Sequence, residues 1–435
     1  TIKKYKKIPE LDYHSILNWI STGYFKDKTS FLLDSKYKDS NLGPNINWYY
    51  KPNNLSFDET VKNFSKIFEK LIREKVDNKR VVLPLSGGLD SRSIAVALRG
   101  YTNVVCYSYE FEGGVKETEY ARIIADKNNW EFFSFKIEKG YLWDKINKIS
   151  DINNCEADFL NPRQMAVINK ISKLGDILIS GQWGDVLFDS YTMDEGFDAL
   201  SNYTIQNITK SGGVELAKDL WENWKLEGSF ENYFCDNIKF LLKKYDLKNN
   251  SANYRAFKSE HHAKRWANTN LKIFTDNIDT FFPYYEDEIC NFVCNTPEVY
   301  LKERRIQIDY IKRKSEDMAS IPWQVYDLNL YQFKKFNTLY FPRRVFRFIK
   351  RKFDIWFLLK SPLIERNWEN QFYGKLNEEN LKYWLIKNKL LNEIISEKIV
   401  LKYYNKFLNE DPIKYSHPII MILTLSVWCK LKWKK

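Results

Sequence analysis

Helical spacing of apolar residues is clearest just before residue 80. Ser56 and Glu59 have the three-residue separation of a capping box, in which each side chain bonds the backbone N–H of the other. The apolar residues of the segment fall on one helical face, namely Val61, Phe64, Ile67, Phe68 and Leu71. The pattern predicts an amphipathic helix over residues 56–76, and the apolar run at 80–85 predicts a buried strand directly after it.

Strand patterns then alternate with helical patterns as far as about residue 181. The strand-like runs lie at 80–85, 103–111, 131–137 and 176–181, with helical spacing at 91–99 and 117–129. Alternation of this kind predicts a parallel sheet covered by helices on both faces. After about residue 195 the strand signals fade, and segments with helical spacing continue to the end of the chain.

These patterns predict an α/β fold in three parts. Residues 1–55 mix short apolar runs with turn residues and form an appended segment. Residues 56–195 form an α/β nucleotide-type domain with a parallel sheet, and residues 196–435 form a mainly helical region that packs on it. A length of 435 residues fits about two domains, because single cores rarely grow beyond about 250–300 residues.

Composition narrows the function classes. Lys and Arg exceed Asp and Glu by 68 − 56 = 12, which favours polyanionic partners such as nucleotides, nucleic acid, acidic polysaccharide or acidic lipid. The six cysteines form no CxxC pair and the four histidines form no HExxH motif, which argues against a zinc site and favours a reduced, cytoplasmic setting. The apolar stretch at 418–429 is shorter than the ~20 residues of a membrane span.

The sequence PLSGGLDS, which ends at Ser91, places a glycine turn between a predicted strand and a predicted helix. Gly87 and Gly88 lack a Cβ and so let an anion approach the backbone, while Ser86 and Ser91 add hydroxyl donors. The start of the following helix offers unpaired N–H groups and a positive dipole end. Asp90 would repel a phosphate in this cradle unless a divalent cation lay between them, so the turn predicts a nucleotide bound with Mg²⁺.

This turn is neither a Walker A motif nor GxGxxG. It resembles the SGGxDS loop of the PP-loop ATP pyrophosphatases (adenine nucleotide alpha-hydrolase-like), which cut ATP between the α- and β-phosphates. A second segment, ISGQWGDVLFDSY at 179–191, resembles SGEGSDEVFGGY of the asparagine synthetases and directly follows a predicted strand. FFPYYEDEI at 281–289 and the terminal IIMILTLSVWCKL resemble further parts of that family. The chain is therefore similar to the synthetase domain of the asparagine synthetase-like family.

The resemblance implies an ATP-dependent, Mg²⁺-dependent enzyme whose site lies at these two segments. It implies that ATP contacts Leu85, Ser86, Gly87, Gly88, Leu89, Asp90, Ser91, Ser108 and Gly181, and that Mg²⁺ is held by Asp90 and Asp185. The catalytic candidates are Asp90, Asp185, Gln182 and Lys264. The family's pyrophosphate-binding lysine has no motif here, so Lys264 stands beside Arg265, Lys302, Arg305, Lys312, Lys314, Lys334 and Lys335 as a candidate.

By the same resemblance, the enzyme would adenylylate a substrate carboxylate and release pyrophosphate, after which ammonia or an amine would attack and release AMP. Polysaccharide or specialised-metabolite biosynthesis is the expected setting. Two departures bear on this expectation. Gln182 stands where the family has Glu and cannot act as a general base, and Trp183 stands where a small residue is usual. Nearly all of the family's glutaminase domain is missing, so we expect this chain as given not to hydrolyse glutamine and a separate glutaminase to be a candidate partner.

Two other functions remain open from the sequence. A PP-loop tRNA-modifying enzyme suits the positive charge, but no RNA-binding module accompanies it, and nucleic acid is not the expected partner. A non-catalytic nucleotide-binding homologue suits Gln182, although Asp90 and Asp185 argue against it. The basic and aromatic stretch at 341–359 fits either a core-packed helix with a solvated face or a peripheral contact with the inner face of a membrane.

Overall fold

The computed structural model describes residues 10–35, 42–114, 118–337 and 364–433. The basic stretch at 341–359, for which a membrane contact was considered, lies outside the described residues. Within the described ranges, no helix combines the length and the apolar character that crossing a bilayer requires.

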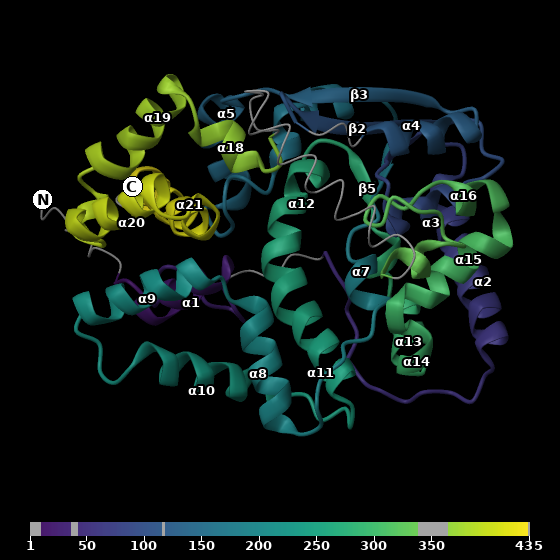
Figure 1. Ribbon diagram of the computed structural model, residues 1–435, viewed down its shortest axis with the longest axis horizontal. Coiled ribbons are helices and arrows are strands. Elements are labelled where there is room, and N and C mark those ends of the chain that lie inside the picture. Colours follow the sequence, from purple (N-terminus) through teal and green to yellow (C-terminus); the bar gives the residue numbers. More distant parts are fainter. Residues whose placement is uncertain (1–9, 36–41, 115–117, 338–363, 434–435) are drawn as a thin grey trace, which may run out of the picture.

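Five parallel strands form one sheet at the centre of the α/β part (Figure 1). They are β1 (Val81–Pro84), β2 (Val104–Phe111), β3 (Glu131–Ile137), β4 (Ile177–Ile179) and β5 (Asp279–Phe281), and their order across the sheet is β3-β2-β1-β4-β5. The strand β1 thus lies between β2 and β4, so the segments that follow β1 and β4 leave the same edge of the sheet side by side. The predicted parallel α/β fold is confirmed.

Helices flank the sheet as the alternating pattern predicts. They are α2 (Phe57–Val76), α3 (Leu89–Ala97), α4 (Thr118–Lys127), α5 (Tyr141–Asn153), α6 (Ile168–Ile171) and α7 (Gly184–Leu187). The predicted capping box of α2 is present, because the Glu59 N–H donates to the Ser56 hydroxyl at 3.3 Å and the Ser56 N–H donates to the Glu59 carboxylate at 2.9 Å. Helix α2 buries its apolar face, including Phe64 and Phe68, which have no exposed surface.

The fifth strand was not predicted from the sequence. Strand β5 has only three residues, Asp-Thr-Phe, and Asp279 is exposed. A three-residue run with one apolar side chain carries too little periodicity to be recognised as a strand. The sheet therefore takes its last strand from the part of the chain that was expected to be helical. The division of the chain into domains at residue 195 stays a prediction.

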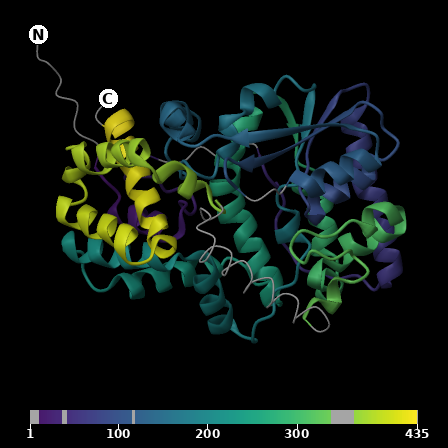
Figure 2. The same ribbon diagram turned by 45° about the horizontal axis from the view of Figure 1, so that its top comes forward.

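The remaining described chain is mostly helical, as expected. Its helices are α8 (Phe197–Ile208), α9 (Ser211–Asn223), α10 (Phe230–Leu242), α11 (Asn250–Phe257), the π-helix η2 (Lys258–Ala267), α12 (Asn268–Thr275), α13 (Asp287–Cys294), α14 (Glu298–Leu301), α15 (Arg305–Lys314), α16 (Glu316–Ser320), α18 (Asn367–Phe372), α19 (Lys375–Lys382), α20 (Glu397–Asn409) and α21 (Pro412–Trp428). The run α11, η2 and α12 is continuous, and it stands between the sheet and the helices α20 and α21 in both views (Figures 1 and 2).

The N-terminal segment is built into this helical region. Its helix α1 (Tyr13–Thr22) lies beside α9 (Figure 1), and Trp19 on α1 has no exposed surface. The Trp19 indole N–H donates to the carbonyl of Glu156 at 2.9 Å, and Arg265 donates to the carbonyl of Thr29 at 2.9 Å. Residues near the start of the chain therefore share a core with residues from its middle.

Candidate active site

The glycine turn lies at the carboxyl end of β1 and leads straight into α3. The Ser91 hydroxyl accepts from the Ser86 N–H at 3.1 Å, and the two hydroxyl oxygens are also 3.1 Å apart. The Gly88 N–H donates to the Ser86 hydroxyl at 3.2 Å. The turn is therefore pre-shaped by its own serines, with Leu89 opening the helix whose N-terminal N–H groups favour an anion.

A second turn, between β4 and α7, packs directly on Asp90. A Cβ added to Gly181 would lie 2.9 Å from the Asp90 Cβ, and one added to Gly184 would lie 2.2 Å from the Asp90 carboxylate oxygen Oδ1. Both distances are too short for any side chain, so glycine at these two positions allows the two turns to touch. The contact places Asp185, in the first turn of α7, close to Asp90, as the parallel order of the strands predicts.

Two side chains from the start of α15 hold the Asp90 carboxylate. Arg304 and Gln307 both donate to Oδ1 of Asp90, the amide of Gln307 at 2.9 Å. Gln307 also accepts from Arg304 at 2.7 Å and donates to the Tyr284 hydroxyl at 2.9 Å. Burial raises the pKa of Asp90, and Asp185 raises it further, whereas the Arg304 charge opposes both. The carboxylate is therefore half-buried and held in position by two donors.

The backbone bends sharply to bring Arg304 to this position. Glu303 and Arg304 have φ angles of 57° and 61°, in the left-handed region that side chains disfavour. The Glu303 N–H donates to the Asp189 carboxylate at 3.0 Å, which holds this bend against the loop that follows α7. Neither residue was singled out from the sequence, because Arg304 is one of many cations between 302 and 314 and no motif marks it.

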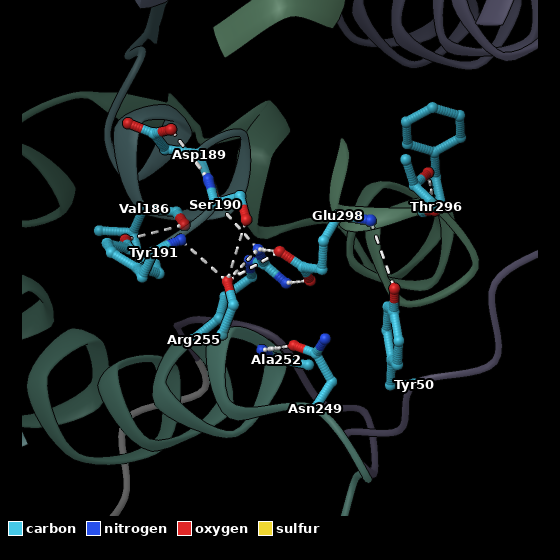
Figure 3. A network of polar contacts seen from close by, with 12 residues as sticks. Tyr50, Val186, Asp189, Ser190, Tyr191, Asn249, Ala252, Arg255, Thr296 and Glu298 are labelled. Carbon is cyan, nitrogen blue, oxygen red and sulfur yellow. Dashed lines mark hydrogen bonds and ion pairs between the residues drawn. The ribbon is translucent and has the colours of Figure 1, made fainter. Parts of the chain in front are cut away.

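A buried network fixes the loop after α7 (Figure 3). Arg255 on α11 makes two hydrogen bonds to the Glu298 carboxylate, at 2.8 and 2.9 Å, and donates to the Asp189 carbonyl at 2.8 Å. The Ser251 hydroxyl donates to Glu298 at 2.7 Å and accepts from the Tyr191 N–H at 3.0 Å. Burial would raise the pKa of Glu298, but the Arg255 charge outweighs it and the pKa is lowered. The loop is thus tied to two helices of the helical region.

The residues present fit a Mg²⁺ ion that arrives with a nucleotide. Within the described residues there is no group of three or more His, Cys, Asp or Glu side chains that could hold a metal without further ligands. Among the same residues, both donors to Asp90 use Oδ1, and none donates to Oδ2. Mg²⁺ in nucleotide sites commonly takes one or two carboxylates and completes its shell with phosphate oxygens and water. Asp90 and Asp185 match that donor set.

A cavity of about 830 Å³ opens beside Asp185. Its walls include four cationic side chains, Lys258, Lys302, Arg304 and Lys334. An aromatic cluster formed by Trp323, Tyr326 and Phe333 also lines it, with ring centroids 4.7 to 5.7 Å apart. Three carboxylates, Asp185, Asp189 and Glu303, line it as well, so the cations exceed the acids by one. This mixed lining suits a phosphate chain bound together with a metal ion.

The structure divides the lysine candidates into those that line this cavity and those that do not. Lys302 and Lys334 line this cavity, and so does Lys258, which was not singled out from the sequence. Burial lowers the pKa of Lys258 and the nearby Asp185 opposes that shift. Lys264, the catalytic candidate, lies six residues further along η2, pairs with Glu260 at 3.4 Å and is not among the residues that line the cavity.

Gly87 contacts Gln324, which lies far from it in the sequence. The Gly87 carbonyl accepts from the Gln324 N–H at 3.2 Å, and a Cβ on Gly87 would lie 2.6 Å from the Gln324 Cβ. Both glycines of the turn were expected to admit phosphate oxygens. In the structure, Gly87 accommodates Gln324, whereas the nearest atom to a Cβ on Gly88 is the Ser86 hydroxyl, at 3.2 Å.

The other predicted residues lie around the same edge of the sheet. Ser108 is buried on β2, and its neighbour Tyr107 has no exposed surface and donates to Gln164. Gln182 is half-buried in the turn before α7. Trp183 is buried with a φ of 79°, and its indole donates to the Ser259 hydroxyl at 3.2 Å. The structure thus gathers Gln182 and Trp183 beside the contact between the two turns.

A parallel sheet with a glycine turn at β1 and a paired carboxylate turn at β4 defines a PP-loop nucleotide-binding fold. Comparison with protein families then identifies the kind of enzyme. The asparagine synthase family model matches residues 67–291, just over half of the 435 residues, and the chain belongs to that family. It is therefore an ATP-dependent synthetase.

Comparison with individual proteins adds little. Among solved structures, the NMN synthetase from Francisella tularensis is similar, at 12% identity over 47% of this chain and 93% of that one, with a TM-score of 0.22. No curated protein matches the chain in sequence.

Proposed function

We propose that the protein is an AMP-forming and pyrophosphate-forming amide synthetase that activates a substrate carboxylate with ATP. The contact between the two turns carries this proposal. Gly181 and Gly184 seat the turn of Asp185 against Asp90, so two carboxylates meet at the N-terminal ends of α3 and α7. Such a pair suits a metal-bound triphosphate at the carboxyl edge of a parallel sheet.

The proposed reaction has two steps. In the first, a carboxylate oxygen of the acceptor attacks the α-phosphorus, the bond from that phosphorus to the bridging oxygen breaks, and pyrophosphate leaves with the electron pair. In the second, the nitrogen of ammonia or an amine attacks the acyl carbon of the adenylate. AMP leaves with the electron pair of the C–O bond, and the nitrogen loses a proton to solvent.

The chain's own groups would bind and orient these reactants. Ser86, Gly88 and Ser91 would hold the phosphate chain at the start of α3, where their N–H and hydroxyl groups would exchange the bonds they make within the turn for bonds to phosphate. Lys302 and Lys334 would neutralise the departing pyrophosphate from the wall of the 830 Å³ cavity. Gln182 would orient the acyl group through hydrogen bonds of its amide. It would not act as a base, because an amide side chain does not titrate.

Asp90 and Asp185 are the residues that would hold Mg²⁺. The ion would supply charge stabilisation for the phosphate oxygens. Arg304 would keep Asp90 in position through the same carboxylate oxygen that it binds in the structure. An acceptor from polysaccharide or specialised-metabolite biosynthesis, with ammonia or an amine as the nitrogen source, completes the proposal.

The test measures products. The protein is incubated with ATP, Mg²⁺, ammonium and a pool of carboxylates that includes aspartate and uronic acids, and AMP and pyrophosphate are quantified. We expect carboxylate-dependent release of both, reduced at least about 100-fold in Asp90→Asn and in Asp185→Asn. Asp126→Asn is the matched control, because Asp126 is an exposed carboxylate on α4.

Two results would contradict the proposal. One is release of ADP and phosphate in place of AMP and pyrophosphate. The other is full activity in Asp185→Asn, whose exposed side chain can be changed without disturbing a core. Asp90→Asn leaves Arg304 without its anionic partner, so its thermal unfolding is recorded beside its activity to separate misfolding from loss of chemistry.

A further inference from the structure

A second cavity, of about 660 Å³, adjoins the first. Lys258 lines both cavities, and it is close enough to Asp185 for that carboxylate to shift its pKa. On another side the second cavity is lined by Arg163, whose guanidinium lies 5.5 Å from the ring centre of Tyr109 at the carboxyl end of β2. The cavity therefore reaches the same edge of the sheet that holds the two turns.

The charges of this cavity favour an anion. Four cationic side chains line it, Arg163, Lys210, Lys258 and Arg366, against two acidic ones, Asp158 and Glu365. The Asp158 carboxylate already accepts from the N–H groups of Leu160 and Asn161, both at 2.9 Å, and so is engaged in its own turn. The cationic groups thus outnumber the acidic ones, and one of the two acids is committed elsewhere.

Two residues on its aromatic side, Tyr24 and His262, carry polar atoms without partners among the described residues. In the described part of the chain, the Tyr24 hydroxyl and Nδ1 of His262 are buried and have no hydrogen-bond partner. Their rings lie 4.8 Å apart, and Trp266 stacks on His262 at 4.9 Å. Burial holds the pKa of His262 at about 3, so the imidazole is neutral. A buried polar atom without a partner is destabilising, and a hydrogen bond to a ligand hydroxyl would relieve that cost.

We propose that this cavity binds the acceptor, and that the acceptor is a ring-shaped, hydroxyl-bearing carboxylate with the chemistry of a sugar acid. The proposal rests on the proposed function above. Trp266 and Trp368 offer flat faces for a ring, while Tyr24 and His262 offer partners for its hydroxyl groups. Lys258 receives the carboxylate and directs it toward the nucleotide. The volume also exceeds what a small amino acid such as aspartate fills.

In the first step of the proposed reaction, the acceptor carboxylate reacts with the nucleotide. One of its oxygens forms the bond to the α-phosphorus as pyrophosphate leaves, so the cavity has to bind the acid in its ionised form. The cationic residues Lys210 and Arg163 keep the acid ionised, while Tyr24 and His262 fix the ring at the other end. Because these roles concern the acceptor alone, altering the aromatic side is expected to leave nucleotide affinity unchanged.

The experiment measures binding without turnover. The full chain is saturated with Mg²⁺ and α,β-methylene-ATP, which resists cleavage at the α–β position, and D-glucuronate and L-aspartate are titrated by calorimetry. We expect glucuronate to bind at least about tenfold more tightly than aspartate. Tyr24→Phe is expected to weaken glucuronate about fivefold, the worth of one hydrogen bond, and to leave the dissociation constant of the nucleotide unchanged.

Matched variants separate binding from folding. Tyr24→Phe removes a hydroxyl that has no partner in the described protein, so its melting temperature is expected to stay the same or rise. Tyr404→Phe changes a buried tyrosine on α20 that does not line the cavity and is expected to leave glucuronate binding unchanged. Lys210→Ala, at the exposed rim, is expected to weaken glucuronate, and Lys398→Ala, at an exposed position on α20, to have no effect.

Three outcomes would overturn the proposal. They are failure of glucuronate to bind the wild-type protein, unchanged glucuronate affinity in both Tyr24→Phe and Lys210→Ala, and a loss of nucleotide affinity in those variants. The last would assign the cavity to the nucleotide. If glucuronate binds as expected but no carboxylate yields AMP and pyrophosphate, the proposed function is contradicted while the cavity keeps its assignment.

Discussion

At the scale of single residues, Arg92 shows how the glycine turn is held in shape. It has no exposed surface, and its guanidinium donates to the carbonyls of Gly87 at 3.1 Å and Pro322 at 2.8 Å. It also donates to the carbonyls of Met318 and Ile321, at 3.2 and 2.8 Å. Burial lowers the pKa of Arg92 to about 10, so the group is still charged at neutral pH. One side chain thus joins the phosphate turn to the segment that covers it.

Replacing Arg92 by Lys is expected to weaken the contact between the glycine turn and the segment that contains Pro322. An ammonium group cannot reach four carbonyls in the planar arrangement of a guanidinium, so buried acceptors lose their donors. We expect unfolding free energy to fall by about 2–3 kcal/mol and the KM for ATP to rise about tenfold, with a smaller change in kcat. Denaturant unfolding and steady-state kinetics measure both. Arg122→Lys, on the surface of α4, is the control, and an unchanged KM in Arg92→Lys would refute a positioning role.

Which residues the sequence could reveal depends on whether a local motif marks them. The serines, glycines and Asp90 of the first turn became candidates because their spacing is distinctive, and Asp185 because its segment resembles a family motif and follows a strand. Arg304 and Lys258 carry no such mark, since only contacts between segments far apart in the chain place them beside Asp90 and Asp185. The sequence marked Trp183 as a departure from the family's usual small residue. Only the structure could show its left-handed backbone and its hydrogen bond to Ser259.

At the scale of elements, strands with a clear apolar run were predicted and the one without was missed. The strands β1 to β4 are apolar enough to stand out from their surroundings, and parallel order then placed the β4 turn beside the β1 turn. Strand β5 is formed by three residues whose pairing with β4 defines them, from Asp279 opposite Ile177 to Phe281 opposite Ile179. Pairing between distant segments leaves little trace in a three-residue sequence.

Among the helices, Glu215 on α9 joins α20 and α21. Its carboxylate accepts from Lys406 at 2.5 Å and lies 2.8 Å from the Lys414 ammonium. Partial burial raises the pKa of Glu215, but the hydrogen bonds and charges of the two lysines outweigh it and lower the pKa to about 2. Because the folded pKa lies below the unfolded value near 4.5, this stabilisation is present above pH 4.5 and is lost as the pH falls toward 2.

Glu215→Gln is therefore expected to lower unfolding free energy by about 1 kcal/mol at pH 7, the upper range for a partly exposed ion pair. The difference from wild type is expected to shrink between pH 5 and pH 2. Thermal unfolding at several pH values measures it, with Glu222→Gln, an exposed position on the same helix, as the control. A difference that stays constant down to pH 2 would show that the ion pairs contribute nothing.

At the scale of the whole molecule, the N-terminal segment is a structural part of the enzyme. Phe25 and Phe31 pack on Trp19 with ring centroids 5.7 and 5.1 Å away, and Phe31 stacks on Trp428 of α21 at 4.5 Å. Tyr24, from the same segment, lines the proposed acceptor cavity. Residues near both ends of the described chain pack together here. This core can therefore form only when the N-terminal segment and α21 are both folded.

Trp19→Ala is accordingly expected to destabilise the entire protein rather than one edge of it. Truncating a fully buried tryptophan typically costs about 3–5 kcal/mol, a large share of the total stability of a folded protein. We expect a single unfolding transition at a clearly lower temperature, and a matching loss of Mg-ATP binding at 37 °C. Leu33→Ala, whose side chain is 52% exposed, is the control from the same segment. If Trp19→Ala instead melts in two steps and keeps nucleotide affinity through the first, the N-terminal segment folds as a separate layer and the sheet does not depend on it.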